Sequence, residues 1–242
     1  MAQRRNVRLL EADPGLALQI ASPERERATL ALVAAAESLE RGVWDQATNA
    51  FKPTEGALGV LLVDGLMLRE VGIAQSHCAE LVGKGDVLRP WKHIGSGAPV
   101  PSEVTWRVLE RSTIAYLDGR FVELAAHWPA VIAALAVRAV ERAQSLTVAF
   151  AIACMTGLNT RMLTLLWTLA DRWGRVGADG VHLELPLTHE TLARMSGATR
   201  PSVSTALKEL ERGGQISRNA TRGYVLHGDP PEALTRGRPQ VG

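Results

Sequence analysis

The segment that most constrains this fold is residues 188–212, which reads as two short helices joined by a tight turn. Gly197 stands where the first helix must reverse direction, and such a reversal favours the left-handed backbone that glycine adopts without strain. Thr188 and Thr199 are suitable N-caps for the two helices. Pro201 falls in the first turn of the second helix, where a missing N–H costs nothing. The segment therefore predicts two helices with short, well-defined ends.

The second helix of this segment has one apolar side and one polar side. Its apolar stripe follows the i, i+3, i+4, i+7 pattern and consists of Val203, Ala206, Leu207 and Leu210. At 100° per residue, the opposite side carries Pro201, Thr205, Lys208 and Arg212, flanked by Ser202 and Ser204. Ala193, Gly197 and Val203 provide close helix approach, the turn and the packing contact of a helix-turn-helix. An ordinary helical hairpin with a solvated face is the alternative.

The polar side chains of the second helix suit a DNA groove. Arg200 can reach guanine O6 and N7 near the helix N-terminus, where side chains meet base edges. Ser202, Ser204 and Thr205 are short enough to contact phosphate, base or a thymine methyl group. Lys208 is a candidate phosphate contact. In the first helix, Thr188 and His189 are candidates for the DNA backbone as well.

The residues after the two helices predict a wing. Ile216–Arg218 and Gly223–Leu226 read as two short strands, and they place Arg218 and Arg222 at the tip between them. Residues 186–226 contain six Lys or Arg against three Asp or Glu. The basic excess of the chain is also C-terminal, because residues 119–242 carry net charge +4 and residues 1–118 carry −2. A winged helix-turn-helix that binds double-stranded DNA accounts for all of these features.

The N-terminal half has a different pattern of apolar and turn-forming residues. Between residues 28 and 118, short apolar runs separated by Gly, Pro and Asp predict the strands of a small β-barrel or jelly roll. Asp64 and Gly65, between Leu58–Val63 and Leu66–Val71, predict a hairpin turn. Residues 92–102 read as a loop. The predicted fold class is therefore α+β.

A long helix is predicted to start at Pro129 and run to about Thr156. Apolar residues recur along it with the three- and four-residue steps of a coiled-coil seam, interrupted at Arg142: Ile132, Leu135, Ala139, Leu146, Ala149 and Ala153. The seam predicts a dimerisation helix, and a long core helix of a monomer is the alternative. Gly157 ends it, with Asn159 or Thr160 as the cap of the next helix, which ends near residues 172–174.

A sensor barrel, a long helix and a winged helix-turn-helix form the layout of the Crp/Fnr family of bacterial transcription regulators, which this chain resembles. The quotations that carry the resemblance are "GALGVLLVDGLMLREV", "LVGKGDVLRPW", "FAIACMTGLNTRMLTLLWTLA" and "LTHETLARMSGATRPSVSTALKELERGGQI". The resemblance implies a cyclic-nucleotide-binding-like sensor domain (1–127), a dimerisation helix (128–157), a DNA-binding domain (158–228) and a disordered tail (229–242). It places Arg200 at the base-reading position, whereas Pro201 and Thr205 differ from well-known members.

The same resemblance implies a homodimer that regulates transcription from an inverted-repeat operator. RNA polymerase and an unidentified small-molecule effector are further candidate partners. The alternative is a ligand- or protein-sensing module of the same fold with weak DNA binding.

The predicted sensor domain departs from the cyclic-nucleotide pattern. Gly85 and Asp86 are followed by no Gly-Glu pair, and no Arg-Ser or Arg-Thr pair appears between Gly95 and Val108. We therefore expect no cyclic nucleotide, and Arg89 and Trp91 are the candidate effector contacts. Trp106 is expected to lie in the core. For Trp91 a core position is also more common than a position stacked on a ligand.

Other classes of function find little support in the sequence. The two cysteines, Cys78 and Cys154, form no metal spacing, so we expect no metal site and no iron–sulfur cluster. A lone His77-Cys78 pair does not predict haem. Motifs for hydrolases, metalloproteases and P-loop enzymes are missing, so we expect no enzyme. The longest apolar stretch, Leu146–Met155, is too short to span a bilayer, and with no signal peptide predicted, we expect a cytoplasmic protein.

Overall fold

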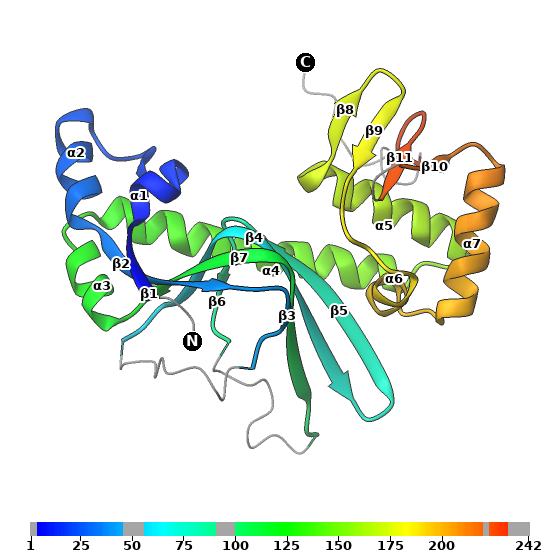
Figure 1. Ribbon diagram of the computed structural model, residues 1–242, viewed down its shortest axis with the longest axis horizontal. Helices are drawn as coiled ribbons and strands as arrows, with labels where there is room; N and C mark the ends of the chain where they lie inside the picture. The colour runs from blue at the N-terminus through cyan, green and yellow to red at the C-terminus, as the bar shows by residue number, and fades with distance from the viewer. Residues whose placement is uncertain (1–3, 46–55, 91–99, 220–222, 232–242) are drawn as a thin grey trace. The chain divides into compact units, whose positions relative to one another are not determined.

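The computed structural model describes residues 4–45, 56–90, 100–219 and 223–231, and it contains two compact units, Met1–Ser145 and Leu146–Gly242. Each unit is a mixture of helices and antiparallel strands (Figure 1). The predicted α+β class is confirmed. Within the described residues, no helix combines the length and the apolar character that a membrane crossing requires.

The N-terminal unit is built on one antiparallel sheet whose strands run in the order β1-β2-β7-β4-β5, with β3 paired to β7 and β6 paired to β4. The strands are β1 (Arg4–Arg8), β2 (Val33–Leu39), β3 (Gly42–Val43), β4 (Gly59–Ile73), β5 (Ser76–Gly83), β6 (Val87–Leu88) and β7 (Glu103–Leu117). In the described part of the chain β1 and β5 are the two ends of the strand order, so the sheet is jelly-roll-like and does not close into a barrel.

The hairpin predicted at Asp64 and Gly65 is wrong. Both residues lie inside the single 15-residue strand β4, and the reversal comes later, at Ala74 and Gln75, between the paired residues Ile73 and Ser76. The pairing of β4 with β7 shifts register around Asp64 and Gly65, which is a β-bulge. Gly65 has φ +97°, and a Cβ there would lie 2.3 Å from Ser112 Oγ on β7. The glycine therefore serves close strand approach rather than a turn.

The sheet has an apolar core on each face, because successive residues of a strand point to opposite sides. On one face, Leu61 and Leu117 pack against the helical segments α1 (Leu9–Ala12), η1 (Pro14–Ala17), α2 (Ser22–Ala31) and α3 (Gly119–Ala125) and the first turns of α4 (Pro129–Ala153). On the other face, Trp44 and Trp106 meet edge to face with ring centroids 5.9 Å apart. The predicted core position of Trp106 is confirmed, and Trp91 lies outside the described residues.

Ion pairs fix the first half of α4 to the sheet unit. Arg138 Nη2 donates to Asp13 Oδ1 at 2.8 Å, and this buried carboxylate raises the pKa of the Arg138 guanidinium. Arg142 forms an ion pair with Glu80, which also accepts from Arg69 Nη1 at 2.8 Å. Arg142, which interrupts the predicted seam, is therefore an anchor of the helix.

The predicted coiled-coil seam is only partly free to meet a second chain. Leu135 is 2% exposed, and Ile132 packs against the same core as Leu135. The large apolar residues that α4 leaves exposed in this unit are Val137 and Val140, at 55% and 57%. A single-chain core and a dimer seam share the same periodicity, so the sequence pattern does not tell which side of the helix stays free.

The C-terminal unit contains the three helices and the wing that the sequence predicts, together with a hairpin of two further strands. Its elements are the end of α4, α5 (Leu158–Trp173), β8 (Arg175–Gly177), β9 (Gly180–Leu183), α6 (His189–Ser196), α7 (Arg200–Arg212), β10 (Ile216–Arg218) and β11 (Tyr224–Leu226), as Figure 1 shows. The strand order is β10-β11-β9-β8, so the wing continues into a second hairpin. Gly157, with φ +81°, occupies the N-cap position of α5, so the predicted Asn159 or Thr160 cap is wrong.

Candidate nucleic-acid interface

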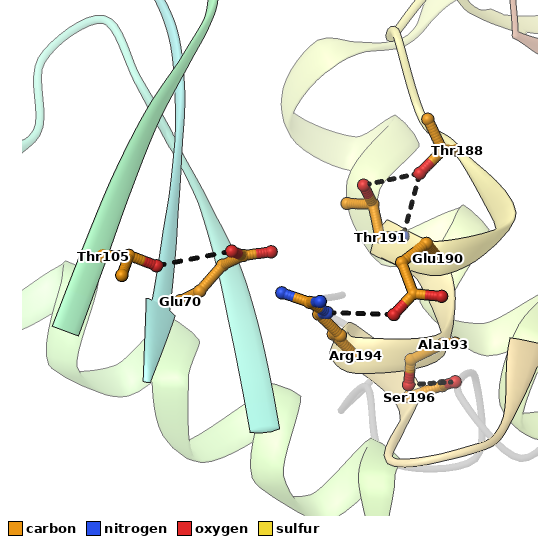
Figure 2. Close-up of polar contacts among 8 residues, drawn as sticks. All are labelled: Glu70, Thr105, Thr188, Glu190, Thr191, Ala193, Arg194 and Ser196. Carbon is orange, nitrogen blue, oxygen red and sulfur yellow. Dashed lines mark hydrogen bonds and ion pairs between the residues drawn. The ribbon is translucent and has the colours of Figure 1, made fainter. Parts of the chain in front are cut away.

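The helix-turn-helix is fixed by local contacts at its ends. Thr188 Oγ1 accepts from the Thr191 backbone N–H at 3.0 Å at the start of α6, as Figure 2 shows. Gly197 ends that helix with φ +64° and ψ +31°, the left-handed conformation that the sequence predicts. Thr199 caps α7 by accepting from the Ser202 N–H at 3.4 Å. The predicted caps and turn are therefore confirmed.

Additional polar contacts hold α6 together. Arg194 Nε donates to Glu190 Oε1 at 3.1 Å one turn earlier, and Ser196 Oγ donates to the Ala193 carbonyl at 3.3 Å (Figure 2). Figure 2 also draws a cross-strand contact of the N-terminal sheet, in which Thr105 Oγ1 donates to Glu70 Oε2 at 3.4 Å.

Helix α5 supports the motif through residues that sequence reasoning missed. Arg161 Nε donates to the Met155 carbonyl at 3.0 Å, and its Nη1 donates to the Ser196 carbonyl at 3.0 Å. These carbonyls lie at the end of α6 and just after α4, where intrahelical donors run out. Asn159 Nδ2 donates to Glu209 Oε2 at 2.7 Å and so links α5 to α7. No local pattern signals these contacts, because the partners on α6 and α7 lie 35 and 50 residues away.

The predicted base-reading face of α7 is exposed. Its apolar stripe is buried as predicted: Val203, Ala206, Leu207 and Leu210. Arg200 and Lys208 are exposed, and no described residue forms a hydrogen bond or ion pair with either side chain. Both cations are therefore available for an outside anion.

The hydroxyl groups on the same helix already have partners in the protein. Ser204 Oγ donates to the Arg200 carbonyl at 3.0 Å, and Thr205 Oγ1 donates to the Pro201 carbonyl at 3.2 Å. Ser202 Oγ lies 2.8 Å from Thr199 Oγ1. A phosphate accepts hydrogen bonds and donates none when ionised, so the Ser204 and Thr205 hydroxyls must each leave the carbonyl they now donate to before they can bind a phosphate oxygen.

Arg218, predicted at the tip of the wing, is held by three neighbours. Its Nε donates to Glu211 Oε1 at 3.1 Å, and its guanidinium lies 5.3 Å from the centre of the Tyr224 ring. Its Nη2 lies 2.9 Å from Nε2 of His189. The sequence brings Arg218 and His189 to the same site, but it gives no sign of Glu211 or Tyr224. Arg222 lies outside the described residues.

Charge and burial around this cluster shift two pKa values. Burial of the imidazole lowers the pKa of His189, and the nearby cations Arg218 and Arg200 lower it further, with Glu211 opposing them. Burial of the Tyr224 hydroxyl raises the pKa of that group. His189 therefore favours its neutral form in the folded protein.

The candidate effector residues of the N-terminal unit are less defined. Arg89 is exposed just after β6, and Trp91 lies outside the described residues. The preceding Gly-Asp turn is tight, since Gly85 has φ +90° and Asp86 Oδ2 accepts from the Gly83 N–H at 2.8 Å. Across the described ranges, no group of three His, Cys, Asp or Glu side chains is arranged for a metal ion.

Two helices with a left-handed glycine turn, followed by a two-stranded wing, define the winged helix-turn-helix class of DNA-binding domains. Comparison with known families identifies the type, because residues 160–232 match the Crp-like helix-turn-helix domain. The regulatory protein CysR of Synechococcus elongatus is 35% identical over 63 residues, which cover 25% of this chain and 31% of CysR. The chain thus aligns with about a third of that relative's length.

Solved structures share the fold across both units. A cyclic nucleotide-binding domain containing protein from Listeria monocytogenes EGD-e has a TM-score of 0.61 and 15% identity, over 78% of this chain and 87% of that one. TTHB099, a transcriptional regulator of the CRP family from Thermus thermophilus, has a TM-score of 0.55 and 21% identity, over 82% and 94%. The resemblance to Crp/Fnr regulators is thereby confirmed, and the C-terminal domain of this chain is a Crp-like helix-turn-helix domain.

Proposed function

We propose that this protein is a sequence-specific DNA-binding transcriptional regulator. One observation carries the proposal: Arg200 and Lys208 are exposed and unpaired among the described residues, on the second helix of a Crp-like helix-turn-helix. Arg200 is the first residue of α7, where a recognition helix meets base edges. Arg200 then reads a base, and Lys208, about two turns further on, contacts a phosphate.

Charge on the motif supports the same function. Arg200, Lys208 and Arg218 provide three cations per chain on α7 and the adjoining wing strand. Because Arg200 reads a base, a dimer brings the other four cations to phosphates, and the affinity should fall roughly 150-fold between 50 and 200 mM salt. Thr188, His189, Ser202, Ser204, Thr205 and Arg222 complete the proposed DNA-binding set.

The regulator is proposed to act as a homodimer through α4. Val137 and Val140 are three residues apart, so they lie on one face of the helix, and both are more than half exposed. Exposed valines at this spacing suit burial against the same face of a second copy, at about 1.5–3 kcal/mol for each fully buried side chain. A twofold dimer reads an inverted repeat with half-sites about 34 Å apart.

The finer assignments follow from this function. The proposed domains are the sensor domain 1–127, the dimerisation helix 128–157, the DNA-binding domain 158–228 and the tail 229–242. We place the protein in the cytoplasm, where it contacts RNA polymerase and has no catalytic activity. An effector that binds the sensor domain meets Arg89 and Trp91. Calorimetric titration with cyclic AMP and cyclic GMP tests whether the sensor domain binds a cyclic nucleotide. Binding of either nucleotide with micromolar affinity would contradict our expectation that it does not.

Selection of bound sequences from random DNA tests the main proposal. Purified protein, with and without cell extract, should enrich an inverted repeat with half-sites one helical turn apart. Enrichment only in the presence of extract would indicate a required effector. A single, unrepeated half-site would contradict the dimer, and no enrichment under either condition would favour a sensing module with weak DNA binding.

A further inference from the structure

Four polar groups of the C-terminal unit form a directed chain of hydrogen bonds. The Ser204 hydroxyl donates its single proton to the Arg200 carbonyl at 3.0 Å. Ser204 Oγ lies 2.7 Å from His189 Nδ1, and since its proton is already used, it must accept from that nitrogen. His189 therefore carries its proton on Nδ1, and Nε2 has a free lone pair.

That lone pair faces the arginine of the wing strand. Arg218 Nη2 lies 2.9 Å from His189 Nε2, and a guanidinium can only donate. The chain thus runs from Arg218 on β10, through His189 on α6, to Ser204 and the first residue of α7. Each link is directional, so the neutral Nδ1–H form of His189 is the one that satisfies the whole chain.

We propose that His189 is a positioning residue that holds Arg218 in register with the recognition helix, so that Arg218 meets a DNA phosphate. The inference rests on the proposed DNA-binding function and deepens it. It also changes the role of His189, which acts through Arg218 instead of contacting the phosphate itself.

The contacts of Arg218 leave it able to bind while limiting its motion. Its side chain is 57% exposed, so the guanidinium can reach solvent and an outside anion. Glu211 takes the Nε proton and His189 takes one Nη2 proton, which leaves three of the five N–H donors for a phosphate. An arginine already held in one rotamer loses less conformational entropy when it binds.

Protonation of His189 would break this arrangement. A second ring proton would sit on Nε2 and point at Arg218, where two donors face each other. The charged groups around the imidazole are Arg218 on β10 and Arg200, Lys208 and Glu211 on α7. Three of the four are cations, so the surroundings favour the neutral ring that the chain of hydrogen bonds requires.

Two variants of His189 separate hydrogen bonding from packing. His189→Phe keeps a ring of similar size and removes both hydrogen bonds. His189→Gln places an amide oxygen where Nε2 was, so it can still accept from Arg218. Arg218→Ala sets the reference for complete removal of the guanidinium. Thermal melting of each variant checks that the unit still folds.

The measurement is the slope of log affinity against log salt on the selected operator. We expect Arg218→Ala to reduce the slope by about 0.9 for each phosphate that is no longer neutralised. His189→Phe should reduce it by the same amount, the double variant should match Arg218→Ala alone, and His189→Gln should restore most of the slope. If Phe and Gln give the slope of the unsubstituted protein, or if both lower it equally, the positioning role is refuted.

Nitrogen-15 spectra of the imidazole in the DNA-free protein provide a second readout. They should show His189 neutral near pH ~7.5 with its proton on Nδ1, and a proton on Nε2 would overturn the inference. Failure to select any DNA sequence would instead refute the proposed function, and with it the role of His189 on DNA. Operator binding with unchanged slopes would refute this inference alone.

Discussion

The sharpest test of base reading is Arg200→Ala. Arg200 is exposed on the first residue of α7, and its side chain has no hydrogen-bond or ion-pair partner among the described residues. Truncating it breaks no hydrogen bond or ion pair with a described residue, so the main loss should appear on DNA. A bidentate arginine–guanine pair contributes about 1–3 kcal/mol to discrimination. A dimer that reads two half-sites would lose about 2–6 kcal/mol, or roughly 30-fold to 10⁴-fold in affinity.

Lys208→Ala is the matched comparison on the same exposed side of the helix. Lysine holds a phosphate as a point charge and does not identify a base, so its removal should weaken operator and unrelated DNA alike. Its salt slope should fall by about 1.8 for a dimer, since each phosphate left without its cation removes about 0.9. Arg200→Ala should instead weaken the operator far more than unrelated DNA.

Fluorescence anisotropy on the selected operator and on a permuted sequence, at salt concentrations between about 50 and 200 mM, measures both effects. Circular dichroism should show unchanged melting for both variants, because neither side chain is buried. Equal losses on the two DNAs for Arg200→Ala would assign that residue to the backbone. An unchanged operator affinity would show that α7 does not read bases through this arginine.

Four further predictions address the dimer, the pH dependence and the fold. Val140→Asp should weaken self-association by more than about 100-fold in sedimentation, since a charge replaces an apolar contact; an unchanged dimer would place the interface elsewhere. The lowered pKa of His189 means that below about pH 6.5 the unfolded chain takes up a proton that the folded chain resists. The free energy of unfolding measured in urea should therefore fall as the pH drops below about 6.5, and it should fall less in His189→Gln than in the unsubstituted protein. Identical pH profiles for the two proteins would contradict this. Asp13→Ala should cost the N-terminal unit about 3–5 kcal/mol in urea unfolding, because it leaves a half-buried arginine unpaired; a loss below about 1 kcal/mol would show that solvent screens the pair. Gly65→Ala should cost at least about 2 kcal/mol and more than Gly42→Ala, because both glycines have positive φ but only Gly65 is crowded by a neighbouring strand; equal costs would mean that the clash relaxes freely.

The helix-turn-helix could be predicted from the sequence because its determinants are local. The caps at Thr188 and Thr199, the turn at Gly197 and the buried stripe of α7 all lie within one short segment and use contacts three or four positions apart. Local hydrogen bonding and helical periodicity decide each of them without reference to the rest of the chain. The wing strands follow directly and could be placed for the same reason.

The strand that contains Asp64 and Gly65 shows where local reasoning stops. An Asp-Gly pair between apolar residues suits a two-residue turn, and it equally suits a bulge inside a long strand. The choice depends on the neighbouring strand, where Arg111 and Ser112 approach Gly65 from far along the chain. Nothing in the local pattern carries that information. The same holds for the long helix, whose apolar periodicity cannot distinguish its own sheet from a second copy.

The residues of the candidate site form two groups, unpaired cations and hydrogen-bonded side chains, and the sequence does not predict this division. From the sequence, Arg200, Ser204 and Lys208 belong to one set because they occupy one helix, and His189 and Arg218 join them by motif. In the structure, Arg200 and Lys208 lack a described partner, whereas Ser204, His189 and Arg218 bond to one another. An unpaired cation can bind DNA without first giving up a contact, while a hydroxyl that already donates must exchange one hydrogen bond for another. The affinity that comes from charge should therefore depend mainly on the arginine and lysine side chains. The hydrogen-bonded Ser204 and His189 should act by fixing the position of Arg218.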